Sequence, residues 1–418
     1  MIDTILCVDI GTSSLKAALL PDNLTKNEIF VSRQAFPACA FREQNSAQYY
    51  LPALKAALSE LREKNPDYAI EAICVSGNGP TVISENYRTL LYSDVFMLGM
   101  GRHKIKRDAV KNTKSLFIPR FLGFKSLFTH EWQLSAHIFG APEFLIHELT
   151  GESVAILPEE RFLPAYWTEE ELKNCGFSDS DLQKLPPFVK MGAFAGKITQ
   201  KAALETGLLE GTFVFAGAPD FVVALLGTGT IFPGRLCDRA GTSEGLNLCT
   251  AKPIFAEGLR TLPSAIPGLW NLSYLLNSSQ IGSVKKLHSN FSDSPKQLCC
   301  VGLRVHGETF LCENSSNTIN LSVNSVSSVR NFNELTHGIS LLREAATANG
   351  EYFPECMTIT GGQALNADLI AQKEKSTGLK IKKMPCADAE LLGDLILARV
   401  ALGDFDDIEE AVFALLGA

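Results

Sequence analysis

An α/β protein built in two halves is the fold class that this sequence predicts, and three observations carry that prediction. Its 418 residues exceed the usual size of one domain. Apolar runs of strand length alternate with helical stripes in the first and last thirds of the chain. The tripeptide Gly-Thr-Ser occurs at 11–13 and again at 241–243, each time between two predicted strands and near the start of one half.

A β-hairpin opens the first half. Residues 5–8 and 15–20 are apolar runs of strand length, and the polar stretch between them suits a turn. A third strand is expected at 28–33, and a helix at 46–64, where leucines recur at spacings of three and four. A short strand at 69–75 then leads into the turn-rich loop SGNGPT. These elements predict one α/β layer.

The second half repeats this order after a strand at 212–218, which ends in Pro219-Asp220 and is followed by a short apolar helix. A second hairpin is expected within 234–250. The remaining expected elements are a helix at 332–349, a strand at 357–359, the loop TGGQALN, a helix after that loop, a strand at 380–384 and a helix at 387–402. We therefore predict two domains, at 1–231 and 232–418.

Composition excludes several classes of partner. The net charge of −8 argues against a nucleic-acid surface, because phosphate backbones are held mainly by Lys and Arg. No run of eighteen uncharged apolar residues occurs, so no membrane span is expected. The eleven cysteines show no paired CxxC spacing, which is typical of reduced thiols in a cytoplasmic protein.

The first hairpin turn has the chemistry of a phosphate site. A tight turn at Gly11 lets backbone N–H groups converge on an anion, and the hydroxyls of Thr12 and Ser13 add donors. Lys16 adds a positive charge. Asp9 would repel a bare phosphate, which indicates an intervening Mg²⁺ or its water. A merely polar hairpin turn remains the alternative.

Four segments together resemble the motifs of the FGGY carbohydrate kinases. In order, DIGTSSLKAAL is similar to the first phosphate motif, GLLEGTFVFAGAPDFVVALLGTG to the catalytic-acid segment, AGTSEG to the second phosphate motif and TGGQALNADL to the nucleotide loop. EFLIHELTGE and the C-terminal AELLGDLILARVALGDFDDIEEAV also have counterparts, and xylulose kinases look nearest. The resemblance implies two ribonuclease-H-like domains of the actin and hexokinase superfamily around an interdomain nucleotide cleft.

The resemblance also implies roles for the matching residues. Asp220 would be the catalytic base, and Asp9 would hold Mg²⁺ through water. The residues expected to bind ATP are Gly11, Thr12, Ser13, Lys16, Gly241, Thr242, Gly362 and Asn366. The residues expected to bind the substrate are Asn78, Gly79, Arg102 and Asp220. Asp220 has a second interpretation, because Asp at a helix start often caps the helix.

The expected function is therefore ATP-dependent phosphorylation of a small sugar or polyol, for example a ketose such as xylulose, by a protein whose candidate assembly is a homodimer. The segments expected to bind the substrate differ from those of the family's other members. Residues 77–81 read GNGPT where relatives carry a loop similar to GQMHG, and Met100 stands in place of an acid, although Arg102 is kept. A kinase-like regulatory protein that binds nucleotide or sugar without turnover is thus the alternative.

GTSEG at 241–245 also matches the nucleophile elbow of serine hydrolases. That elbow needs an apolar strand before it and a helix after it. Here the polar CDRA precedes the motif and a strand-like LNLC follows it, so a hydrolase is disfavoured.

Overall fold

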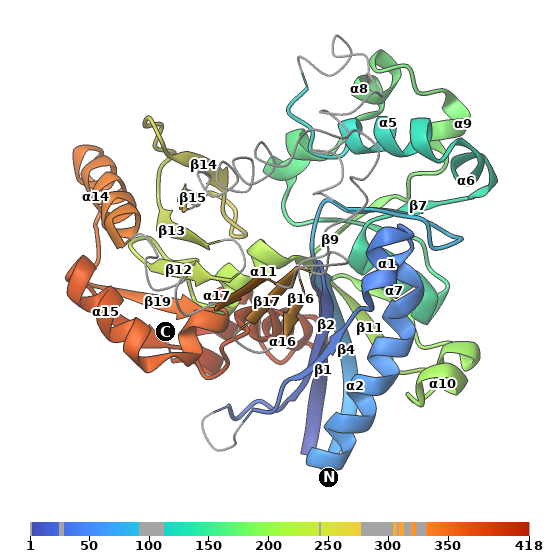
Figure 1. Cartoon of the computed structure of the whole chain (residues 1–418), viewed down its shortest axis with the longest axis horizontal. Helices are drawn as coiled ribbons and strands as arrows, with labels where there is room; N and C mark the ends of the chain where they lie inside the picture. Colours follow the sequence, from blue (N-terminus) through green and yellow to red (C-terminus); the bar gives the residue numbers. More distant parts are fainter. Residues whose placement is uncertain are drawn as a thin grey trace.

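The computed structural model describes residues 2–24, 29–91, 113–241, 244–276, 304–306, 309–312, 319–322 and 332–417. Within these ranges two six-stranded sheets form the body of the molecule, and helices cover their faces (Figure 1). The α/β class predicted from the sequence is confirmed. No described helix is long and apolar enough to span a membrane.

The first sheet has the strand order β10-β11-β4-β1-β2-β3. Its strands are β1 (Ile2–Ile10), β2 (Ser14–Leu20), β3 (Ser32–Ala35), β4 (Tyr68–Gly77), β10 (Phe194–Lys197) and β11 (Phe213–Pro219). The strands β1 and β2 form the predicted antiparallel hairpin. The strands β1, β4 and β11 are parallel, with Ile10 opposite Gly77 and Gly77 opposite Pro219, so the loops that follow them leave the sheet at one edge.

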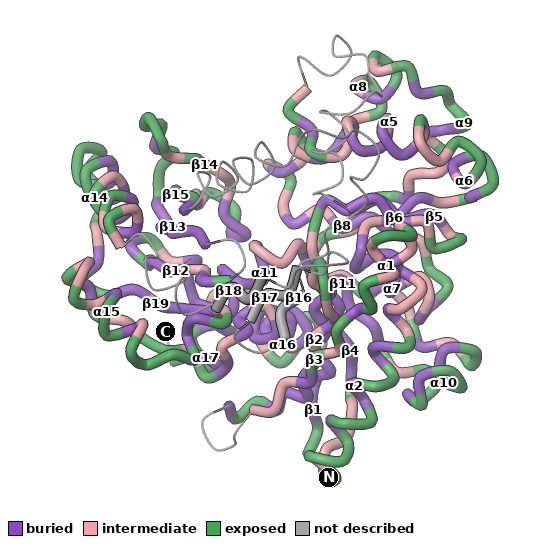
Figure 2. The backbone as a smooth tube through the Cα atoms, viewed as in Figure 1, coloured by how far each residue is buried: buried purple, intermediate pink, exposed green. Residues whose placement is uncertain are grey.

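Helices cover both faces of this sheet because its central strand is apolar on both sides. Leu6 and Val8 of β1 belong to one core with the helices α2 (Tyr50–Lys64), α7 (Ala141–Thr150) and α10 (Gln200–Thr206). Ile5 and Cys7 point to the other face, against α16 (Ala389–Leu402). In Figure 2, where buried residues are purple, these strands and the helix faces against them are buried. The C-terminal part of the chain thus completes the first sheet's core.

The second sheet has the order β14-β15-β13-β12-β19-β20. Its strands are β12 (Leu236–Ala240), β13 (Glu244–Thr250), β14 (Arg260–Pro263), β15 (Trp270–Leu275), β19 (Cys356–Thr360) and β20 (Lys380–Lys383). The hairpin β12–β13 repeats the arrangement of β1–β2, as the recurring tripeptide predicted. The helix α14 (Phe332–Ala348) packs on β13 and β15, and α15 (Ala367–Thr377) packs on α14.

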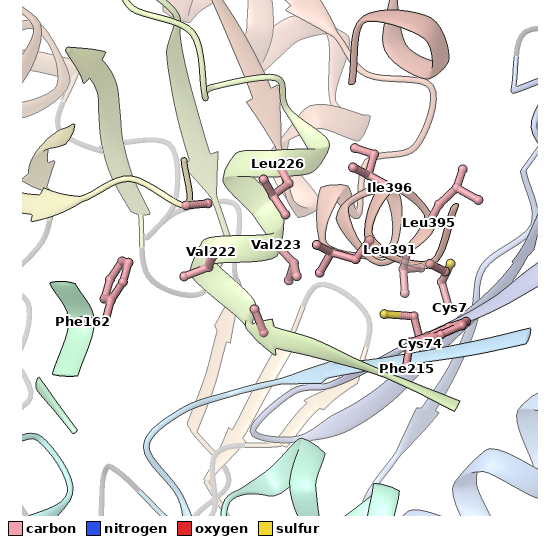
Figure 3. Close-up of a cluster of buried hydrophobic side chains, with 14 of the residues drawn as sticks. Cys7, Cys74, Phe162, Phe215, Val222, Val223, Leu226, Leu391, Leu395 and Ile396 are labelled. Atoms are coloured by element: carbon pink, nitrogen blue, oxygen red, sulfur yellow. The ribbon is translucent and has the colours of Figure 1, made fainter. Parts of the chain in front are cut away.

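Two helices cross between the sheets, α11 (Asp220–Gly227) and α16. A Cβ at Gly227 would overlap the carbonyl of Ala389, and a Cβ at Gly393 would overlap the carbonyl of Val223. Figure 3 shows the side chains of the two helices meeting at this crossing. Glycine at both positions therefore permits the close approach of the helix backbones.

The remaining elements lie mostly on the first sheet's side. The helices are α1 (Ala38–Arg42), α5 (Ile118–Leu127), α6 (Thr129–Leu134), α8 (Glu169–Asn174), α9 (Asp179–Leu182) and α17 (Ile408–Leu416), with 3₁₀ turns η1 (Ser46–Tyr49), η2 (Glu160–Ala165) and η3 (Gly362–Leu365). The strands are β5 (Val82–Ser84), β6 (Thr89–Leu90), β7 (Ile138–Phe139), β8 (Ala155–Leu157), β9 (Phe188–Lys190), β16 (Arg304–His306), β17 (Thr309–Cys312) and β18 (Ile319–Ser322).

Most sequence-predicted elements agree with these bounds, and one is displaced. The strand expected at 28–33 lies at Ser32–Ala35, because its backbone pairs there with residues 14–17 of β2. The predicted domain boundary at 231/232 stays a prediction. The cysteines whose side chains the structure describes are free thiols, as expected: Cys7, Cys39, Cys74, Cys175, Cys237, Cys249, Cys356 and Cys386.

Candidate active site

Asp9 and Lys16 face each other across the first hairpin. They are paired in the strand register, and Lys16 Nζ lies 2.9 Å from Asp9 Oδ2. The turn between them is closed by the Gly11 N–H, which donates to the Ser14 carbonyl at 2.9 Å. Thr12 and Ser13 at its tip are exposed. The hydroxyls predicted to bind phosphate are thus open to a ligand.

Lys16 also contacts the start of α16. Its Nζ lies 3.5 Å from Asp388 Oδ1 and 3.8 Å from Glu390 Oε2, and Arg33 forms an ion pair with Asp388. Burial disfavours the charged ammonium, but Asp9, Glu390 and Asp388 outweigh it and raise the pKa of Lys16. Burial likewise raises the pKa of Glu390 to about 7, against the opposing charge of Lys16. Sequence reasoning missed both acids, which come from the far end of the chain.

Asp9 retains one free acceptor. Its side chain is buried, and Oδ1 has no hydrogen-bond partner in the described part of the chain. A buried carboxylate oxygen without a donor is costly unless something supplies one. Mg²⁺ prefers oxygen ligands and bound waters, so the free carboxylate oxygen of Asp9 suits the expected ion.

Asp220 is the first residue of α11, and the N-cap position belongs to Pro219. Its Oδ1 accepts the N–H of Phe221 at 2.6 Å, and α11 has no side-chain cap hydrogen bond. Asp220 therefore satisfies one N–H of the first turn of α11, although it does not occupy the N-cap position. Burial and the charge of Asp9 raise the pKa of Asp220, whereas Arg239 and Lys16 oppose that rise.

The substrate loop predicted at 77–81 lies between the hairpin and Asp220. Asn78 Nδ2 donates to Thr12 Oγ1 at 3.1 Å, and Thr81 Oγ1 donates to Asn78 Oδ1 at 2.7 Å. A Cβ at Gly79 would lie 3.9 Å from Pro219 Cβ. Arg102 and Met100 lie outside the described residues.

The second hairpin meets the nucleotide loop directly. Gly361 has a φ of +89°, and a Cβ there would lie 2.6 Å from the Ala240 carbonyl and 2.9 Å from Gly241 N. Gly362 has open space, with nothing within 4 Å of a Cβ. Asn366 Oδ1 accepts the Leu369 N–H at 3.0 Å and caps α15, a structural role that the sequence prediction missed. Thr242 lies outside the described residues.

The loop before α16 connects the nucleotide loop to Lys16. Gly361 N donates to Ala387 O at 2.6 Å, and Thr360 Oγ1 donates to the same carbonyl at 2.7 Å. The next residue is Asp388, which contacts Lys16. Ion pairs and hydrogen bonds thus link the first hairpin, the loop before α16 and the nucleotide loop within the described residues.

A buried charge cluster lies behind the second hairpin and was not foreseen. Lys373 forms ion pairs with Asp238 and with Glu244, whose Oε1 lies 2.7 Å from Nζ. Gln363 of the nucleotide loop donates to Glu244 Oε2 at 2.9 Å. Burial raises the pKa of Asp238 to about 6, against the charge of Lys373. This cluster fixes η3 and α15 to the hairpin.

Comparison with solved structures shows which proteins share this fold. A xylulose kinase from Lactobacillus acidophilus superposes with a TM-score of 0.67 at 17% identity, over 99% of this chain and 92% of that one. A gluconate kinase from the same organism gives 0.67 at 16% identity, over 100% and 92%. Glycerol kinase from Plasmodium falciparum, with ADP, gives 0.64 at 13%, over 99% and 92%. The chain has the two-domain fold of these sugar kinases.

Curated relatives match a shorter stretch. The autoinducer-2 kinase of Yersinia enterocolitica is 36% identical over 87 residues, which are 20% of this chain and 16% of that protein. That of Yersinia pestis is 34% identical over 87 residues, with the same coverage. The matched stretch thus spans about a sixth of these relatives' length. No family model matches the chain.

Proposed function

We propose that this protein is an ATP-dependent carbohydrate kinase of the FGGY type, which transfers the γ-phosphoryl group of ATP to a hydroxyl of a sugar or polyol. The observation that carries the proposal is the convergence of Asp9, Lys16 and Asp220 at one edge of the first sheet. These three residues supply a magnesium ligand, a phosphate-binding cation and a base, which phosphoryl transfer to a hydroxyl requires.

The nucleotide would be bound by both hairpins. Thr12, Ser13 and Lys16 would contact the outer phosphates. The residues proposed for the inner phosphates and the adenosine side are Gly241, Thr242, Gly362 and Asn366. Mg²⁺ held by Asp9 through water would neutralise charge on the phosphate oxygens. In the free protein, the Lys16 ammonium forms ion pairs with carboxylates. Phosphate oxygens of the nucleotide would replace some of these contacts.

Asp220 would orient the acceptor hydroxyl and take its proton as the new O–P bond forms. A proton on the carboxylate would abolish this role, so the raised pKa of Asp220 sets a lower pH limit on activity. Asn78, Gly79 and Arg102 would bind the substrate. Closure of the domains 1–231 and 232–418 would exclude water, which otherwise competes as acceptor. We further propose a cytoplasmic protein that acts as a homodimer.

The substrate class is tested by an acceptor panel. ADP release from MgATP is measured with ketoses such as xylulose, with aldoses, glycerol and gluconate, and with autoinducer-2, which the matched kinases suggest. Strong stimulation by one acceptor is expected. Nucleotide binding without stimulation by any acceptor would contradict the kinase and favour the non-catalytic alternative, which the altered loop at 77–81 motivates.

A further inference from the structure

Arg239 lies on the face of β12 that is turned away from the buried charge cluster of Asp238 and Lys373. Alternate residues of a strand share a face, so Arg239 lies with Cys237 and opposite Asp238, which points into the buried cluster with Lys373. Burial raises the pKa of Cys237, and the hydroxyls of Thr230 and Thr228, which follow α11 in the chain, oppose that rise.

The Arg239 side chain has no carboxylate partner among the described residues. Its Nε is buried and lacks a hydrogen-bond partner there, and no ion pair engages its guanidinium in the described ranges. Its Nη2 lies 3.9 Å from the position that a Cβ would occupy at Gly245, so the guanidinium extends over the second hairpin. Lys16 differs, because three carboxylates already share its ammonium.

The charge of the same guanidinium also acts on Asp220. The charge of Arg239 opposes the rise in the pKa of Asp220 that burial and Asp9 cause. Gly241, which follows this strand, lies against Gly361 of the nucleotide loop. Arg239 thus lies on the proposed phosphate hairpin itself, opposite Gly245, and its charge acts on the proposed base.

We propose that Arg239 is a further catalytic residue, which donates hydrogen bonds to the phosphoryl group during its transfer; the inference rests on the proposed kinase function. In this step the acceptor oxygen forms a bond to the γ-phosphorus, and its proton passes to Asp220. The bond between the γ-phosphorus and the bridging oxygen breaks, and its electron pair stays on ADP. Arg239 remains charged throughout and exchanges no proton.

Arginine suits this role for two physical reasons. The guanidinium is planar and presents several donors in a fork that matches phosphoryl oxygens, and it stays charged at any working pH. Negative charge in the transition state is spread over the equatorial oxygens, where such a cation stabilises it. Since Arg239 has no ion pair to give up within the described chain, binding the phosphoryl group costs no existing contact.

The test compares Arg239→Gln and Arg239→Lys with the control Arg235→Gln, an exposed arginine one residue before β12. Calorimetry measures binding of MgADP alone and of MgADP with aluminium fluoride, which mimics a phosphoryl group in transfer. We expect Arg239→Gln to bind MgADP within about threefold of wild type but to lose roughly 10² or more in turnover and in fluoride-complex affinity. Arg239→Lys, which keeps the charge without the fork, should be intermediate.

Fluoride-complex affinity equal to wild type in Arg239→Gln would overturn the inference, as would undiminished turnover. A parallel loss in Arg235→Gln would also overturn it, because the effect would then be general. The fluoride complex does not depend on an acceptor, so it decides the role of Arg239 by itself. Absence of acceptor-dependent turnover in wild type would instead overturn the proposed function.

Discussion

The two carboxylate oxygens of Asp9 have different surroundings. One carboxylate oxygen forms the ion pair with Lys16, and the other is buried without a partner in the described structure. A purely structural ion pair would not need that free acceptor at the edge where the parallel strands end. The ion pair and the free oxygen together predict that the affinity for nucleotide depends on Mg²⁺ through Asp9.

Asp9→Asn should remove most of the gain in ADP affinity that Mg²⁺ gives the wild type, because a neutral amide holds the hydrated ion poorly. Calorimetry with MgADP and with ADP in EDTA measures that gain. In EDTA the variant and the wild type should differ little. An unchanged magnesium effect in Asp9→Asn would remove Asp9 from the metal site.

The pH dependence of kcat/KM should report on Asp220. Because the base must be ionised, activity falls as pH drops through its pKa, which burial and Asp9 raise above the usual value for Asp. The acid limb of the profile should thus lie above that of an ordinary aspartate. Arg239→Gln should move it to still higher pH, since the opposing charge is gone. An acid limb that stays in place in this variant would contradict the effect of the Arg239 charge on Asp220.

At the scale of elements, the hairpins and the loops that follow parallel strands were predictable, because turn residues and apolar runs are local signals. The strand β3 was displaced because its position is set by pairing with β2, which is not local. Packing between segments that lie far apart in the sequence determines the surroundings of Asp388, Glu390 and Arg239, so local sequence signals do not reveal them. Asp388 and Glu390, read locally, only mark the acidic start of a helix.

The crossing of α11 and α16 should tolerate no added atom. In Gly393→Ala the new methyl would meet the carbonyl of Val223, so the helices must move apart and lose packing. We expect a loss of roughly 1–3 kcal/mol in unfolding free energy. Gly362→Ala is the control for stability, since nothing lies within 4 Å of that Cβ. Equal unfolding free energies in both variants would contradict the close crossing.

The first turn of α7 carries the buried carboxyl group of Glu143. This group should make the free energy of unfolding fall as pH rises. Burial raises the pKa of Glu143 to about 7, above its value of 4.5 in the unfolded chain. Its contribution is therefore full below pH 4.5 and is lost as pH rises through about 7. Glu143→Gln, which cannot ionise, should show a weaker decline in unfolding free energy over this window. Superimposable declines would rule out Glu143 as their source.

At the scale of the whole molecule, contacts from both sheets complete the site. The loop before α16 bonds to the nucleotide loop, while Asp388 reaches Lys16 on the first sheet. Ligands that contact both sheets should therefore draw them together. Small-angle scattering should show a smaller radius of gyration with an ATP analogue and the true acceptor together. No change with both ligands present would argue against closure.

The central claim is phosphoryl transfer to an acceptor hydroxyl with Asp220 as base, and ³¹P NMR of the product tests it most directly. Wild-type protein with MgATP and the best acceptor should give a sugar phosphate and ADP in equal amounts. Asp220→Asn keeps an oxygen to accept the Phe221 N–H, so it should fold normally but form this product roughly 10² to 10⁴ times more slowly. A sugar phosphate formed at the wild-type rate by Asp220→Asn, or none formed by the wild type, would contradict the account.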